Sequence, residues 1–190
     1  MNTAFIGLDY IHDIMVVGGK VARCAEHASQ RGVIAAANRA IAEARRRGWL
    51  VAQVKVGFAP SYVEQPKHSP LFGRAHEFGA LDLSGPGTDF HPELDVRPED
   101  AIVIKPRVSA FYATSLEAVL RAHRVERLIL AGVSSTWAVQ AAARDAHDRD
   151  YQVLVLEDGC AAASEEEHQA SMRQLATIAR IIRLDELAAL

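Results

Sequence analysis

Short, nearly continuous apolar runs alternate along the chain with longer stretches in which apolar residues recur every three or four positions. The apolar runs occupy residues 4–8, 49–58, 101–104, 127–131, 152–156 and 181–182. Runs of this length are typical of strands buried on both faces, and the longer stretches have the spacing of amphipathic helices. The alternation of the two patterns predicts an α/β fold with a mostly parallel sheet.

Polar residues near the ends of the helical stretches indicate where helices begin. Thr114 and Ser164 each precede a glutamate by three residues, at Glu117 and Glu167, which is the pattern of a capping box. After the second strand, as far as about residue 88, the chain has no period and is rich in proline, glycine, histidine and aromatic residues. We interpret this segment as a binding loop or lid, because loops this long in compact domains usually carry function.

Composition and charge narrow the class of protein. A length of 190 residues and an apolar content of 49% fit one globular domain, residues 1–190. The formal net charge is −3 without a basic block, so we expect neither a nucleic-acid partner nor a membrane partner. The apolar runs are too short to span a bilayer, and the first residues lack the basic region of a secretory signal. We therefore expect a soluble, cytoplasmic protein whose partner is a small molecule.

Three of the predicted strands end in residues that can carry chemistry. Asp9 follows the first strand, Lys105 ends the third, and residues 132–139 join the fourth strand to its helix. In an open parallel sheet, ligands bind beyond the carboxyl ends of the strands, near the point where the strand order reverses. Each feature alone is most often a cap, a solvated side chain or an ordinary turn. Together, a carboxylate, an ammonium group and a helix N-terminus predict a polar site that tolerates anions.

The same residues carry a resemblance to a known family. Asp9, the segment KPRVSAF at residues 105–111 and the segment LAGVSSTWAV at residues 130–139 resemble the isochorismatase-like cysteine hydrolase superfamily. Residues 87–94 and 142–146 fit the same family, so the resemblance covers essentially the whole chain. It implies a three-layer, doubly wound (Rossmann-like) fold with a sheet of about six strands. It also implies an enzyme that hydrolyses amides, ureides or related bonds without a cofactor and assembles as a homodimer or homotetramer.

The catalytic triad of that family is aspartate, lysine and cysteine, and two of the three match. The resemblance makes Asp9 the base and Lys105 the group that stabilises charge, but alanine occupies the cysteine position, at Ala138. A methyl group cannot attack a carbonyl carbon, so covalent cysteine catalysis at this position is excluded. The family turn also implies a cis peptide bond between Val133 and Ser134, and an oxyanion hole formed by the main-chain amides of Ser134 and Ala138.

The remaining cysteines and the scattered histidines are given no catalytic role. Two cysteines make no disulfide framework, and we expect Cys24 and Cys160 to be small buried hydrophobes. Nicotinamidase-like members of the family hold a metal ion with one aspartate and two histidines in a compact stretch. His68, His76 and His91 are too far apart for that spacing, so we expect no metal site.

Aromatic and histidine side chains near the predicted crevice are candidates for the substrate pocket. They are Phe58, Tyr62, His68, Phe111, Tyr112 and Trp137. A pocket lined by these side chains would favour a small, flat or apolar substrate that is held by a few polar groups.

The alanine at position 138 leaves three interpretations open. In the first, the chain is a hydrolase that works without a thiol, as the isochorismatases proper do when their aspartate protonates a vinyl ether. In the second, it is a ligand-binding pseudo-enzyme that keeps the pocket and has lost turnover. In the third, it is a cysteine amidohydrolase whose nucleophile was deliberately replaced by alanine to trap substrate. We favour the hydrolase.

Overall fold

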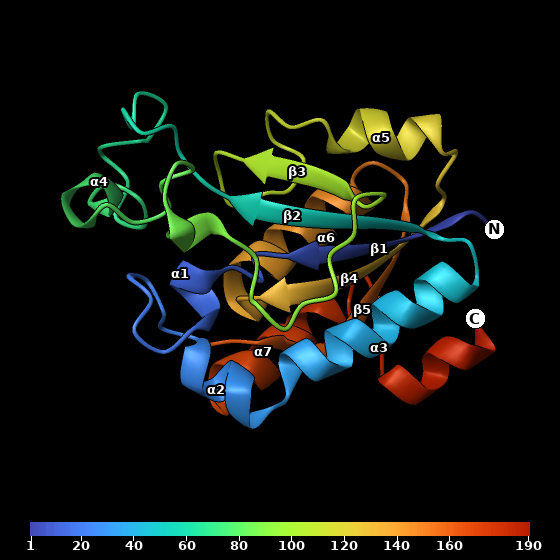
Figure 1. Cartoon of the computed structure of the whole chain (residues 1–190). Helices are drawn as coiled ribbons and strands as arrows, with labels where there is room; N and C mark the ends of the chain where they lie inside the picture. The colour runs from blue at the N-terminus through green and yellow to red at the C-terminus, as the bar shows by residue number, and fades with distance from the viewer.

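The computed structural model describes all residues, 1–190, and is built on a six-stranded parallel sheet (Figure 1). In chain order the strands are β1 (Thr3–Leu8), β2 (Leu50–Val56), β3 (Ala101–Lys105), β4 (Arg127–Val133), β5 (Gln152–Ala161) and β6 (Arg180–Ile182). Across the sheet the order is β3-β2-β1-β4-β5-β6, and every neighbouring pair is parallel. This is a doubly wound order, so the predicted fold class is confirmed.

Helices cover both faces of the sheet. The longer ones are α3 (Val33–Arg46), α5 (Leu116–Ala122), α6 (Gln140–His147) and α7 (Glu165–Leu175). The shorter ones are α1 (His12–Met15), α2 (Ala25–Gln30), α4 (Ala75–Phe78), η1 (Pro86–Thr88), η2 (Ser135–Val139) and η3 (Leu184–Ala189). Helix α3 packs on one face and α6 on the other, which gives the predicted three layers (Figure 1). None of these helices combines the length and the apolar character that crossing a membrane requires.

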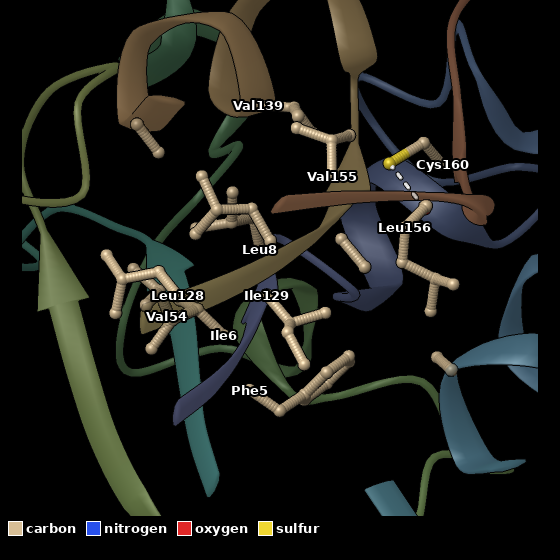
Figure 2. Close-up of a cluster of buried hydrophobic side chains, with 14 of the residues drawn as sticks. Phe5, Ile6, Leu8, Val54, Leu128, Ile129, Val139, Val155, Leu156 and Cys160 are labelled. Atoms are coloured by element: carbon tan, nitrogen blue, oxygen red, sulfur yellow. Dashed lines mark hydrogen bonds between the residues drawn. The ribbon is translucent and has the colours of Figure 1, made fainter. Parts of the chain in front are cut away.

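The central strands are apolar on both faces because both faces are covered. Every residue of β1 is buried. Side chains such as Phe5, Leu8, Leu128 and Val155 fill the space around the sheet (Figure 2). Burying one such side chain contributes about 1.5–3 kcal/mol relative to leaving it exposed. The centre of the sheet is therefore a rigid base for the residues at its carboxyl end.

The strand order reverses between β1 and β4, so the carboxyl ends of these two strands border one crevice. Gly132 lies opposite Leu8 in the register of the pair. Its φ is +154°, and a Cβ added there would lie 2.3 Å from the carbonyl oxygen of Leu8. Glycine is therefore what lets the two strands approach so closely just before the turn that follows β4.

Strands β4 and β5 are both longer than the sequence predicts. Their pairing continues past an irregularity in the register and joins Gly132 to Cys160 and Val133 to Ala161. Cys160 therefore lies within a strand and not after it. The prediction ended both strands early because glycine and charged residues interrupt the apolar runs.

Of the two predicted capping boxes, only the one at α7 provides a cap. The Ser164 hydroxyl accepts a hydrogen bond from the main-chain N–H of Glu167 at 3.2 Å. At α5, the residue that precedes the helix is Ser115, whose side chain makes no capping bond, so the box predicted at Thr114 is wrong. Thr114 donates its hydroxyl to the carbonyl oxygen of Ala110 at 2.6 Å, and its oxygen accepts from the main-chain N–H of Leu116 at 3.3 Å and not from that of Glu117.

Candidate active site

Asp9 and Lys105 form a buried ion pair at the carboxyl ends of β1 and β3. Lys105 Nζ lies 2.7 Å from Asp9 Oδ2, and both side chains are almost entirely enclosed. The ammonium group also donates to the carbonyl oxygen of Val108 at 2.8 Å. Strand β2 lies between β1 and β3, so the long lysine side chain reaches across it. The structure thus brings together two charged groups that are 96 positions apart in the sequence.

The backbone around Asp9 directs its carboxyl group towards β2. Asp9 has a φ of +56°, and its main-chain N–H donates to the carbonyl oxygen of Val54 at 2.8 Å. Oδ1 accepts from the main-chain N–H of Val56 at 2.7 Å. Burial raises the pKa of Asp9 above its ordinary value, although Lys105 and the Val56 N–H oppose the shift. A carboxyl group with a raised pKa is suited to accepting a proton and returning it.

The ion pair borders a cavity of about 180 Å³ whose walls are mostly apolar. Asp9, Lys105, Ser134 and Ala138 all line it, so the residues predicted at three strand ends share one space. The other lining residues are Ile14, Val21, Arg23, Cys24, Val56, Leu71, Phe72, Leu81, Val108, Val133 and Trp137. Such a cavity fits a small substrate with one polar reacting group.

The turn after β4 forms the part of the wall that contains the alanine. The peptide bond between Val133 and Ser134 is cis. The main-chain N–H of Ser134 donates to no acceptor within the chain, and its hydroxyl lies 3.0 Å from that of Thr136. Ala138, in η2, is buried and borders the cavity. This wall therefore offers a hydrogen-bond donor but no nucleophilic side chain at position 138.

Helix α7 fixes this turn through buried polar contacts. Ser171 donates its hydroxyl to the carbonyl oxygen of Ser135 at 2.7 Å, and Gln140 donates to the Ser171 hydroxyl at 2.9 Å. The Ser135 hydroxyl lies 3.1 Å from Nδ1 of His168. Burial lowers the pKa of His168 to about 4, so its imidazole is neutral near neutral pH.

Cys24 lies in the cavity wall, a position that the sequence did not indicate. It directly precedes α2 and is buried, as is Cys160. Burial raises the pKa of Cys24 to about 11 and that of Cys160 to about 12. Both thiols are therefore protonated near neutral pH, and a protonated thiol is a poor nucleophile.

Three of the six side chains predicted to line the substrate pocket lie in the core. Phe58 and Tyr62 belong to a small apolar cluster formed with the long loop, where the Tyr62 hydroxyl donates to the carbonyl oxygen of Ala80 at 2.8 Å. Phe111 stacks on Tyr151 in the main core, with ring centroids 6.2 Å apart. Burying these rings removes a large apolar area from water, which decides where they point.

The other three predicted pocket residues, His68, Tyr112 and Trp137, line a second, open hollow next to the cavity. Trp137 borders both spaces. Among the six, Trp137 is therefore the residue that reaches the cavity of the ion pair.

Most of the cavity wall comes from residues that the sequence did not single out. Leu71 and Leu81 belong to the long aperiodic segment, which was predicted to be a binding loop. Arg23 also lines the cavity, and its guanidinium group forms an exposed ion pair with Glu167 at 2.8 Å. Composition marked the loop, but no spacing indicates which of its side chains point inward.

The three scattered histidines do not come together. His76 packs its ring near that of Tyr62, and His91 accepts from the main-chain N–H of Glu93, while His68 is exposed at the open hollow. No group of three or more histidine, cysteine, aspartate or glutamate side chains in the chain is arranged to hold a metal ion. The residues present therefore do not fit the metal set of the nicotinamidase-like members.

Comparison with known proteins places the chain in a family. A sequence model described as Isochorismatase domain matches residues 3–186. The chain belongs to the isochorismatase family. Ureidoacrylate amidohydrolase RutB from Methylobacterium radiotolerans is 31% identical over 192 aligned residues, which cover 93% of this chain and 74% of that protein.

Solved structures of isochorismatase-family proteins share the fold. One, from Desulfovibrio vulgaris, superposes with a TM-score of 0.89 at 21% identity and covers 99% of this chain and 97% of its own. N-carbamoylsarcosine amidase from Thermoplasma acidophilum superposes with a TM-score of 0.78 at 24% identity and covers 98% of both chains. The amidohydrolase and the amidase are hydrolases by name.

Proposed function

We propose that this member of the isochorismatase family is a hydrolase of small molecules that attacks its substrate with water and not with a thiol. The observation that carries the proposal is the buried pair of Asp9 and Lys105 at the cavity that Ala138 also borders. The names of two relatives, an amidohydrolase and an amidase, support an amide or ureide as the substrate.

In this mechanism Asp9 first acts as the base. Its raised pKa makes the carboxylate a better proton acceptor than an exposed aspartate would be. Asp9 takes a proton from a water molecule, and the water oxygen forms a bond to the carbonyl carbon of the substrate. The small methyl group of Ala138 leaves room for that water where the family triad has a sulfur atom.

Lys105 and the turn after β4 stabilise the negative charge that develops on the carbonyl oxygen. The Lys105 ammonium borders the cavity, and the main-chain N–H of Ser134 is free to donate to an oxyanion. The main-chain N–H of Ala138 is the second proposed donor. When the carbon–nitrogen bond of an amide breaks, Asp9 returns its proton to the leaving nitrogen, and the products are a carboxylic acid and an amine.

Hydrolysis of a vinyl ether is a second candidate reaction, and the raised pKa of Asp9 favours it. Burial stabilises the protonated carboxyl group, which can donate its proton to the enol carbon before water adds to the resulting cation. Both reactions use the same residues, so the choice of substrate separates them.

The test is a turnover assay with benzamide, N-carbamoylglycine and isochorismate. Asp9→Asn removes the proton acceptor with little change of shape, and we expect it to lower kcat/KM by roughly 100-fold or more on whichever substrate is converted. Asp148→Asn is the matched control, because Asp148 is highly exposed at the far end of α6 and should leave kcat/KM unchanged.

Two results would contradict the proposal. One is that the unmodified protein converts none of the three substrates, in which case the cavity belongs to a binding protein. The other is that Asp9→Asn keeps the wild-type rate. Thermal melts followed by circular dichroism distinguish a loss of chemistry from a loss of fold.

A further inference from the structure

The open hollow beside the catalytic cavity is large enough to hold a second part of the substrate. Its volume is about 910 Å³, compared with about 180 Å³ for the cavity. The two spaces share Leu71, Phe72, Val108 and Trp137 as walls. A molecule whose reacting bond lies at the ion pair can therefore extend into the hollow.

The walls of the hollow carry positive charge and no negative charge. They include Arg107 but no aspartate or glutamate. Nη1 of Arg107 donates to the carbonyl oxygens of Glu64 at 3.0 Å and Pro106 at 2.6 Å. The other two guanidinium nitrogens make no hydrogen bond within the chain, and Arg107 forms no ion pair. A guanidinium group in this state attracts an anion, and its planar fork matches a carboxylate best.

Two exposed aromatic rings border the same hollow. Tyr112 is 58% exposed and Trp137 is 54% exposed, although most large apolar side chains of the chain are buried. The guanidinium carbon of Arg107 lies 5.9 Å from the centroid of the Tyr112 ring. Exposed rings next to a cation offer a flat group a stacking surface and an anionic group a counter-charge.

We propose that the hollow binds the leaving half of the substrate and that this half is a planar ring bearing a carboxylate. The proposal rests on the proposed hydrolase function, because it assigns the small apolar cavity to the acyl half and the hollow to the half that is released. Arg107 pairs with the carboxylate, and Tyr112 and Trp137 contact the ring.

The binding test uses 4-aminobenzoate as the probe and 4-aminobenzamide as its neutral counterpart of nearly the same shape. By titration calorimetry on the full chain, the acid should bind roughly tenfold tighter than the amide, or more. Arg107→Gln should abolish this preference for the acid, and Arg107→Lys, which keeps the positive charge, should retain part of it. Arg173→Gln is the matched control, because Arg173 is exposed on α7 and forms no ion pair, so it should change nothing.

A second variant keeps the test informative if Arg107→Gln does not fold, since Arg107 also holds the carbonyl of Glu64. Tyr112→Leu changes an exposed side chain that contributes little to the core. It should weaken the binding of both probes by a similar factor, because it removes contact with the ring and leaves the charge in place.

Three outcomes would overturn the subsite. The first is equal affinity for the two probes. The second is an equal loss of affinity for 4-aminobenzoate in Arg107→Gln and Arg173→Gln. The third is a dimer, seen by light scattering, that Tyr112→Arg dissociates, because a second copy of the chain would then cover the hollow. Turnover separates the subsite from the reaction. Equal kcat/KM for N-acetyl-4-aminobenzoate and its neutral amide would refute the subsite and leave the hydrolase intact. Binding of 4-aminobenzoate that depends on Arg107, without turnover of any substrate, would refute the hydrolase alone.

Discussion

Position 138 carries an alanine, where the resemblance to the cysteine hydrolases implies a cysteine. Ala138→Cys places a thiol at the cavity that Asp9 and Lys105 also border. The ammonium group and the helix N-terminus favour the thiolate, so the new thiol should titrate below the ordinary value of about 8.5. The rate of alkylation by iodoacetamide as a function of pH measures this. Amide hydrolysis above that of the unmodified protein would show that the rest of the site is competent.

The two natural cysteines set the background rate of alkylation in that experiment, and a thiol at position 141 provides the control. Burial holds the pKa of Cys24 at about 11 and that of Cys160 at about 12, so the unmodified protein should react slowly. Ala141→Cys puts a thiol at the first turn of α6, at the open hollow and away from the ion pair, and should titrate closer to the ordinary value than Ala138→Cys does. If Ala138→Cys titrates like Ala141→Cys, the two charged groups do not act on position 138.

The buried ion pair predicts that removing one charge destabilises the chain more than removing both charges. Lys105→Met leaves the Asp9 carboxylate buried without its cation, and we expect it to lower the free energy of unfolding by about 3–5 kcal/mol. The double variant Asp9→Asn/Lys105→Met removes both charges and should recover much of that loss, because asparagine tolerates the positive φ at this position. Urea unfolding measures both values. A double variant no more stable than Lys105→Met would mean that the unpaired charge is not the cause.

At the scale of residues, the sequence predicted the charged groups and not the walls around them. Asp9 and Lys105 were found because each ends an apolar run, and strand ends meet at one edge of a parallel sheet. Phe58, Tyr62 and Phe111 were assigned to the pocket, but the path of a loop decides whether an aromatic ring points to solvent, ligand or core. The loop sequence has no hydrophobic periodicity, so the sequence does not indicate the path of the loop.

At the scale of elements, the strands were predictable because burial on both faces requires continuous apolar runs. The junction between β4 and α6 was harder to predict. It is a wide helical turn, η2, whose shape depends on contacts with α7. Those contacts join Ser135 to His168 and Ser171, more than 30 positions later. No local pattern reports such a partner.

His168 of α7 makes the stability of the chain depend on pH. Its pKa is about 4 in the folded chain and should return to 6.5 on unfolding. Below pH 6.5, His168 binds a proton in the unfolded chain but not in the folded chain. The free energy of unfolding therefore falls as the pH drops from 6.5 towards 4, by about 3 kcal/mol in total. Burial is the main cause; Arg31 and His27 also lower the pKa, and Glu165 and Glu157 oppose them.

Urea unfolding between pH 7 and 4 tests this linkage. His168→Gln should flatten the loss of stability over that range, whereas His147→Gln, which changes a half-exposed histidine at the end of α6, should not. Asp9 acts in the opposite direction, because an acid with a raised pKa gains stability as the pH falls through that value. The quantity to compare is therefore the difference in the free energy of unfolding between the variant and the unmodified chain at each pH. Identical slopes would contradict a neutral, buried His168.

At the scale of the whole molecule, the resemblance implied the doubly wound sheet and the three layers, whereas the strand order comes from the structure and explains where the cavity lies. The crevice at the reversal between β1 and β4 is where a ligand is expected in any doubly wound sheet. Assembly into a homodimer or homotetramer stays a prediction. Light scattering at micromolar concentration should give a mass of two or four chains, and a monomer mass would contradict it.

Lys105 stands on the edge strand β3, whereas Asp9 follows β1 in the middle of the sheet. Their backbones are thus two strand spacings apart, roughly 10 Å, and only one side chain spans the gap. An edge strand is hydrogen-bonded on one side only and opens by local unfolding more readily than a central strand. Native-state hydrogen exchange should therefore show a lower opening free energy for the amides of β3 than for those of β4, and equal values would contradict this. Each opening carries the ammonium group away from the carboxylate while the rest of the chain stays folded. Under the proposed mechanism, the fraction of molecules competent for catalysis is therefore smaller than the fraction that is folded.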